Sequence, residues 1–153
     1  MYFVVGIKNI KTNIKTMDRI GEDKSGWIKY YKDKNNEEWE EIVIDDRSFT
    51  TLLKKTALPK NIYELMELCF SSKNENDWQG LGQLFSQGKY AYIDIEKFLI
   101  KNPNIKKNRR LKFIESFHPI DNRDMVGKHF KDMYSSYEEY KRTIININKL
   151  CRK

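Results

Sequence analysis

The sequence has few of the residues that interrupt regular structure or build special sites. Its 153 residues include seven glycines, three prolines, two cysteines and two histidines. So little Gly and Pro beside 33% charged residues excludes a low-complexity chain and favours a folded, helix-rich protein. Two cysteines cannot form the disulfide framework of a small secreted domain. Because Cys69 and Cys151 fall on apolar helical positions, we expect buried thiols and no metal site.

Long hydrophobic runs are also missing. No stretch approaches the roughly 20 apolar residues of a membrane-spanning helix. The short apolar run at residues 1–8 has no basic leader, so we expect no secretory signal, no membrane partner and a cytoplasmic location. The length fits a single domain, 1–153, with a core that needs no disulfides.

Charge is unevenly distributed. Residues 1–76 carry 13 bases and 13 acids, whereas residues 77–153 carry 16 bases and 9 acids, which is the whole net charge of +7. An acidic block, residues 37–46, has six acids and no base, and a basic block, residues 97–112, has seven bases and no acid. Such polarity is typical of a protein that meets a charged partner.

The pattern predicts an α+β fold, mostly β over 1–58 and mostly α over 59–153. Strands are expected at 2–7, 27–32 and 39–44, and the turn residues at 33–36 join the last two as a hairpin. The polar stretch 11–24 favours a loop or a weak helix. The first sixty residues therefore predict a small antiparallel sheet.

Helical periodicity begins after Pro59. Five or six short packed helices are expected: one over 62–70, one capped by Asn76 or Asp77, one from Asp94 to 100, then 104–117, 121–134 and a last helix capped by Ser135. The helices are expected to pack on the sheet and on each other. A fragment of a helical solenoid is the second interpretation.

The acidic hairpin has two interpretations. Glu38 and Glu40 are expected on one face of the strand, with Trp39 and Glu41 on the other. The acids could form a solvated face beside Lys29, Lys32 and Lys34. They could instead form a docking surface for a basic protein, since acids beside aromatic residues are typical of interfaces.

The basic block also has two interpretations. Its bases are Lys97, Lys101, Lys106, Lys107, Arg109, Arg110 and Lys112. Five of them fall on one predicted, mostly exposed helix. They could bind nucleic-acid phosphates without sequence preference, or be a solvated face of a lysine-rich chain.

Candidate catalytic residues are few. His118 precedes Pro119 and is expected to be structural, whereas Arg123 and His129 resemble the Arg and His of HEPN-type ribonucleases. That resemblance implies that they bind the scissile phosphate and exchange protons during RNA cleavage. No nucleophile lies in a recognisable setting with a histidine, and no metal-ligand spacing occurs. We expect no catalytic site, no metal and no cofactor, with the ribonuclease as an alternative.

One resemblance is carried by the hairpin. Residues 26–33 (GWIKYYKD) followed by 38–41 (EWEE) resemble the hairpin of small bacterial immunity proteins encoded beside polymorphic or contact-dependent growth-inhibition toxins. The resemblance implies a protein that binds one cognate toxin domain tightly, without catalysis or cofactor. Its pattern residues here are Trp27, Tyr31, Asp33, Trp39 and Glu40.

The expected partner is therefore a toxin domain, and nucleic acid is the alternative. The expected partner-binding residues are Trp27, Tyr31, Asp33, Glu37, Glu38, Trp39, Glu40, Glu41, Asp45 and Asp46. The acidic block suits a basic toxin, whereas an acidic toxin would favour the basic block.

Overall fold

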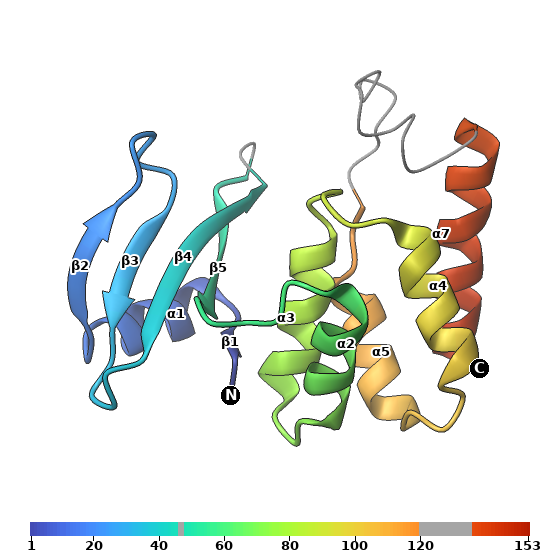
Figure 1. Cartoon of the computed structure of the whole chain (residues 1–153), viewed down its shortest axis with the longest axis horizontal. Helices are drawn as coiled ribbons and strands as arrows, with labels where there is room; N and C mark the ends of the chain where they lie inside the picture. The colour runs from blue at the N-terminus through green and yellow to red at the C-terminus, as the bar shows by residue number, and fades with distance from the viewer. Residues whose placement is uncertain (46–47, 120–135) are drawn as a thin grey trace.

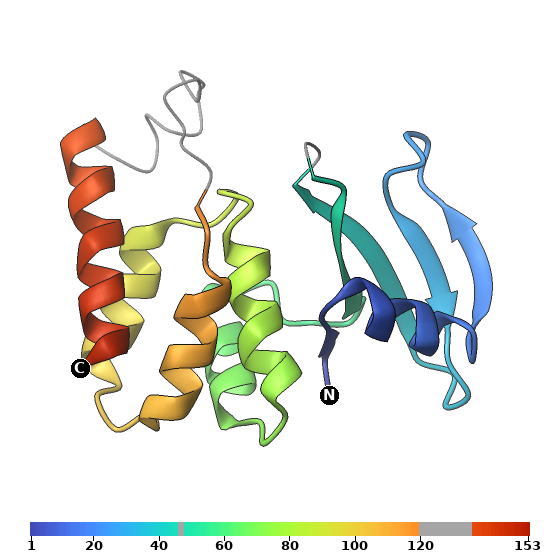
Figure 2. The same cartoon turned by 180° about the vertical axis from the view of Figure 1, so that it is seen from behind.

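The computed structural model describes residues 1–45, 48–119 and 136–153. A five-stranded sheet carries one helix on a face, and the other described helices pack together beside it (Figure 1, Figure 2). The strands are β1 (Phe3–Val4), β2 (Asp18–Glu22), β3 (Lys29–Lys32), β4 (Glu38–Asp45) and β5 (Thr50–Lys55). The described helices are α1 (Ile7–Ile14), α2 (Ile62–Ser71), α3 (Glu75–Phe85), α4 (Tyr92–Lys101), α5 (Lys107–Ser116) and α7 (Tyr137–Arg152). The predicted α+β fold is confirmed.

The sheet is antiparallel, with strand order β1-β5-β4-β3-β2. The predicted hairpin is β3–β4, in which Tyr31 lies opposite Trp39. Asn36 supplies the positive φ of the connecting turn, at 66°. Both strands of the hairpin therefore lie inside the sheet, and β2 and β1 are the edge strands of the sheet.

Two predictions for the first 24 residues are wrong in part. The strand expected at 2–7 is only β1, because Gly6, at φ 91°, turns the chain into α1. The segment 11–24, expected to be a loop or a weak helix, contains the end of α1 and also β2. The strand was missed because all its residues but Gly21 are exposed, so β2 has no buried face to give an alternating pattern.

The helices follow the predicted apolar periodicity, but four begin elsewhere than expected. Asn74, rather than Asn76 or Asp77, caps α3 by accepting from the backbone N–H of Asn76. Asp94 lies inside the first turn of α4. Helix α5 starts at 107 rather than 104.

The last helix, α7, is capped by Ser136 rather than Ser135. The Ser136 hydroxyl accepts from the backbone N–H of Glu139, at 3.1 Å. The predicted helix 121–134 lies outside the described residues.

The two faces of the sheet pack against different helices. On one face, α1 places Ile10 against Tyr31, Trp39 and Leu53. On the other face, Ile42 joins the large core made by the helices. Strand β4 is thus held from both sides, with Trp39 buried on the α1 face and Ile42 buried on the core face.

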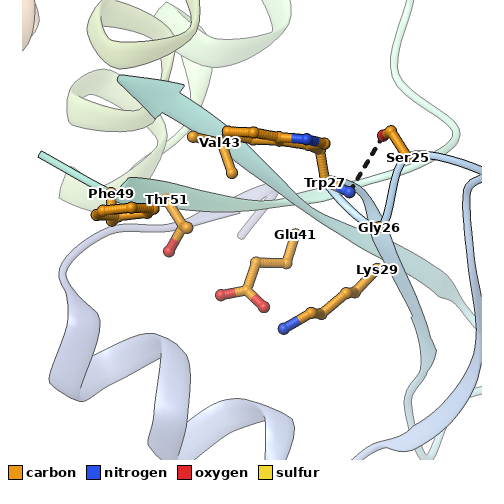
Figure 3. A pocket seen from close by; sticks show the side chains of 8 residues that line it. All are labelled: Ser25, Gly26, Trp27, Lys29, Glu41, Val43, Phe49 and Thr51. Atoms are coloured by element: carbon orange, nitrogen blue, oxygen red, sulfur yellow. Dashed lines mark hydrogen bonds between the residues drawn. The ribbon is translucent and has the colours of Figure 1, made fainter. Parts of the chain in front are cut away.

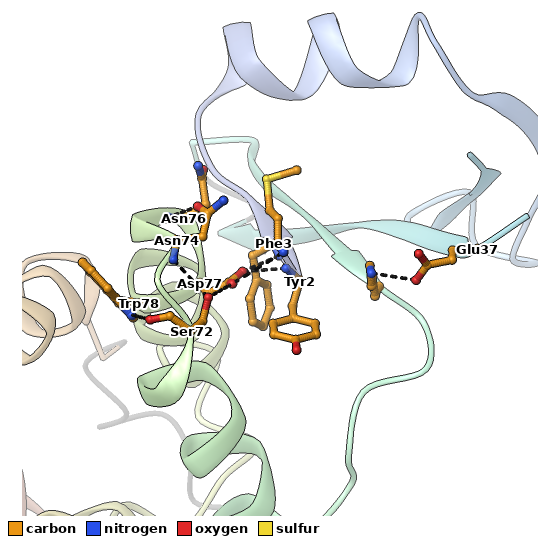
Figure 4. Close-up of polar contacts among 10 residues, drawn as sticks. Tyr2, Phe3, Glu37, Ser72, Asn74, Asn76, Asp77 and Trp78 are labelled. Atoms are coloured by element: carbon orange, nitrogen blue, oxygen red, sulfur yellow. Dashed lines mark hydrogen bonds and ion pairs between the residues drawn. The ribbon is translucent and has the colours of Figure 1, made fainter. Parts of the chain in front are cut away.

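Strand β1 and helix α3 are fastened together by Asp77, which is fully buried (Figure 4). Its Oδ1 accepts from the backbone N–H groups of Tyr2, at 2.6 Å, and Phe3, at 3.0 Å. Its Oδ2 accepts from the Ser72 hydroxyl at 2.5 Å. A carboxylate with this many donors can remain buried because its desolvation is offset by hydrogen bonds.

Both cysteines are free and buried, as predicted. Burial raises the pKa of Cys69 well above its ordinary value and that of Cys151 to about 12. Such thiols are unreactive structural residues.

Among the described residues, none of the helices is both long enough and apolar enough to cross a membrane.

Candidate partner-binding surface

The ten residues expected to bind a partner occupy different environments. Trp27 is 48% exposed, and Glu37 and Glu38 are exposed. The half-buried ones are Asp33, Glu40, Glu41 and Asp45. Tyr31 and Trp39 are buried, and Asp46 lies outside the described residues.

The expectation that Tyr31 and Trp39 lie on the surface is corrected by their burial. They are 7% and 3% exposed, because α1 covers the sheet face on which they lie. The polar group of each side chain still forms a hydrogen bond with an acid of the hairpin, Glu41 for Tyr31 and Asp33 for Trp39. The Tyr31 hydroxyl donates to Glu41 Oε1 at 3.5 Å, and burial with the neighbouring Glu41 carboxylate raises the pKa of Tyr31. Tyr31 and Trp39 therefore do not face a partner directly; they hold the surface acids Glu41 and Asp33 in place.

Asp33 is a turn residue of the hairpin. Its Oδ2 accepts from Trp39 Nε1 at 2.9 Å, and its Oδ1 accepts from the backbone N–H groups of Asn35 and Glu37 at 2.8 and 3.0 Å. The bond from Trp39 is the main reason that the pKa of Asp33 lies below its ordinary value of 3.8. The carboxylate therefore fixes the turn and the Trp39 ring together.

We expect Asp33→Asn to destabilise the protein by about 1 kcal/mol at neutral pH, because the neutral amide cannot accept all three bonds. A depressed folded-state pKa stabilises above the unfolded value, and that contribution is lost as pH falls through the folded value. The stability difference between wild type and variant should therefore shrink as pH falls below 3.8. Urea unfolding from pH 7 downwards measures it. Lys34→Gln, an exposed neighbour, is the control and should leave the profile unchanged.

The acids of the hairpin form ion pairs with β5 rather than with the lysines of β3 or the turn. Glu37 lies 2.6 Å from Lys55 Nζ, and Glu40 is paired with Lys54. The expected partners Lys29 and Lys32 lie opposite Glu41 and Glu38 in the β3–β4 register, but the ion pairs among the described residues of the hairpin come from β5. The acidic block is thus partly neutralised on its β5 side.

A hollow of about 300 Å³ lies on the sheet face that α1 covers only in part (Figure 3). Trp27 and Phe49 form its aromatic walls, from the β2–β3 loop and the β4–β5 connection. The side chains of Glu41 and Lys29 extend to one side of the two rings, and Val43 adds apolar surface beside Trp27. This arrangement offers aromatic anchors around a charged floor.

The floor of the hollow carries one acid and one base, Glu41 and Lys29, which lie opposite each other on β4 and β3. Lys29 also lies opposite Glu22 on β2, but Glu22 is outside the lining and pairs with the Arg19 guanidinium at 3.0 Å. Glu41 accepts a hydrogen bond from the Tyr31 hydroxyl. A cationic or hydrogen-bond-donating group of a partner would bind at Glu41.

Phe49 was missed by the sequence analysis. It is 74% exposed and has a positive φ of 53°, unusual for a bulky residue. The signal available in the sequence was a phenylalanine between Ser48 and Thr50, in a polar segment with no apolar periodicity. Exposed aromatic side chains at both sides of a hollow indicate a binding surface more strongly than exposed acids alone do.

The basic block is not a free surface throughout, which corrects the expectation of a mostly exposed helix. Helix α5 buries Phe113 and Ile114. Arg109 donates to the Phe70 carbonyl at the end of α2, and Arg110 donates to the Leu150 carbonyl in α7 at 2.6 Å. Lys112 pairs with Glu75 at 2.9 Å. The exposed bases of the block are Lys97, Lys101, Lys106 and Lys107.

Of the two histidines, only His118 belongs to the described residues. His118 has an exposed side chain, and its backbone N–H donates to the Ser86 hydroxyl at 2.8 Å. Arg123 and His129 lie outside the described residues. Within the described ranges, no cluster of three His, Cys, Asp or Glu side chains could hold a metal ion.

No protein-family model matches the chain, and neither a curated protein nor a solved structure matches it. Its function is therefore inferred from its own residues.

Proposed function

We propose that the protein is a cytoplasmic, non-enzymatic binding protein of the immunity type, which neutralises a cognate toxin domain by stoichiometric binding. The observation that carries the proposal is the hollow between Trp27 and Phe49, two exposed aromatic side chains beside the charged pair Glu41 and Lys29. Large exposed aromatics at a concave site are the usual anchors of protein interfaces.

The acids in and near the hollow favour a basic partner. A lysine or arginine of the toxin domain would pack its aliphatic stem against the rings and direct its charge to Glu41. The exposed Glu38, at the turn end of β4, adds a further carboxylate on the hairpin, whereas Glu37 is paired with Lys55. The partner surface is therefore basic, with an apolar or aromatic contact at its centre.

The rigidity of the sheet supports this role. The hairpin is held by α1 on one face and by the main core on the other, so the floor of the hollow changes little on binding. Preorganisation lowers the entropic cost of association, which suits a tight inhibitor. The expected complex is 1:1 and buries about 1,200–2,000 Å² in total.

The proposal is tested with the purified product of the gene adjacent to the one that encodes this protein. Immobilised wild-type protein should retain that product at moderate salt, with a complex of defined 1:1 composition on gel filtration. If the product is not retained, the immunity role is contradicted.

We expect Trp27→Ala to weaken that complex by at least about thirtyfold, equivalent to about 2 kcal/mol, because a central aromatic anchor is lost. The side chain is half exposed, so the variant should fold normally. Ile7→Ala, which removes a 64% exposed apolar side chain from α1, outside the lining of the hollow, is the matched control. Equal losses in the two variants would contradict the assignment of the hollow.

A further inference from the structure

A second hollow, of about 380 Å³, lies where the α4–α5 connection meets the end of α2. Three cationic side chains line it: Lys101 at the end of α4, Lys106 before α5, and Arg109 in the first turn of α5. The side-chain amides of Asn102 and Asn104 are also in its lining, and no acid is. The hollow is therefore polar and positively charged.

These charges have no carboxylate partner in the part of the chain that the structure describes: no ion pair there joins an acid to Lys101, Lys106 or Arg109. The partner of Lys112, Glu75, is on α3 and does not line the hollow. A concentration of unpaired cations in a concave site attracts anions, because the low-dielectric walls focus the field.

Arg109 is fixed rather than mobile. Its Nη1 donates to the Phe70 carbonyl, and its guanidinium lies 5.2 Å from the centre of the Trp78 ring. The guanidinium therefore keeps its charge at a constant place beside the hollow.

The N-terminus of α5 adds a second source of donors. No side chain within the described residues caps this helix, and its first turn contains no acid. Unpaired backbone N–H groups and the positive end of the helix dipole favour a bound anion at such a terminus. The cationic side chains and the open helix end lie at the same junction, since Lys106 is the residue that precedes the helix.

We infer that this hollow binds a phosphate group. Lys101 and Lys106 supply mobile charges, Arg109 supplies a fixed one, and the start of α5 supplies backbone donors. A phosphate group occurs both as a free ion and in the backbone of a nucleic acid, and the chemistry of recognition is shared. The inference is independent of the aromatic hollow, which is lined by residues of the sheet and its loops.

The test uses the full chain, labelled with ¹⁵N, and inorganic phosphate as the probe, against chloride at constant ionic strength. We expect saturable shifts confined to the amides of residues 70–71 and 101–109, which line the hollow or adjoin its lining. The double variant Lys101→Gln/Lys106→Gln should weaken binding about tenfold, because two phosphate contacts are lost. Lys97→Gln, exposed on the same helix as Lys101 but outside the hollow, should bind as wild type.

A second arm identifies the source of the phosphate group. A mixed-sequence single-stranded RNA that binds more tightly than inorganic phosphate, and loses that advantage in the double variant, indicates a nucleic-acid backbone. RNA binding no tighter than inorganic phosphate, with both dependent on the two lysines, indicates a free phosphate group. Shifts that do not saturate, or that are the same in the double variant, would overturn the inference.

Discussion

Gly82→Ala is expected to destabilise the protein by about 3 kcal/mol or more, because helices α3 and α5 touch at this glycine. A Cβ atom there would lie 2.3 Å from the backbone oxygen of Phe113 and 3.2 Å from the backbone nitrogen of Phe117. Backbone atoms of a packed helix cannot move aside as a flexible side chain would. The two helices would have to separate, which would open the core around Phe113.

Chemical denaturation measures this effect. Gly21→Ala is the control, because a Cβ at Gly21 meets nothing within 4 Å. It should change the free energy of unfolding by less than about 1 kcal/mol. A Gly82→Ala variant as stable as the Gly21→Ala variant would show that α3 and α5 do not pack as described.

Asp77→Ala is the second large effect, with an expected loss of about 3 kcal/mol of stability. The substitution removes the acceptor of the Tyr2 and Phe3 N–H groups and of the Ser72 hydroxyl, and leaves these donors without it at a buried site. The connection between β1 and the helices would be weakened at the same time. Because Phe3 belongs to the main core, the loss should reach beyond the first strand.

A graded series distinguishes this bond network from a general effect of α3. Ser72→Ala removes only one of the three donors to Asp77, although it also deprives Asn74 N–H of its acceptor at 3.1 Å. Asn76→Ala removes one bond, from the Val5 N–H at 3.1 Å. We expect each to cost about 1 kcal/mol in thermal or urea unfolding. Losses equal to that of Asp77→Ala would contradict the central role of this carboxylate.

The parts of the fold that sequence reasoning predicted are those with local signals. The apolar period of residues 62–70 fixed α2, and the spacing from Tyr137 to Cys151 indicated α7. The β3–β4 hairpin was predicted from two aromatic, β-branched segments around a turn. In each case neighbouring residues alone determine which face is buried.

The parts that were missed depend on contacts between distant residues. Strand β2 is a polar edge, recognisable only by its pairing with β3. Helix α1 was expected only as a weak-helix alternative to a loop over 11–24, and the burial of Tyr31 and Trp39 beneath it was not foreseen. Arg109 is held by the Phe70 carbonyl in α2. Helix α2 ends at Ser71, 36 residues before α5 begins at Lys107. No local pattern carries that information.

The candidate site was predicted in part for the same reason. Trp27 and Glu41 lie on the segments that resemble the immunity-type hairpin, and both line the hollow. Phe49 completes the hollow from a connection that has no distinctive pattern, and the β5 lysines pair with acids that the hairpin alone would leave exposed. The composition of a concave surface built from three segments follows only from the arrangement of the sheet.

The central claim is that the hollow between Trp27 and Phe49 is the binding surface, and isothermal titration of the product of the adjacent gene tests it most directly. Wild-type protein should bind with 1:1 stoichiometry, and Trp27→Ala/Phe49→Ala should bind at least about a hundredfold more weakly. Equal affinity of the wild-type protein and the double variant, with both folded, would contradict the claim.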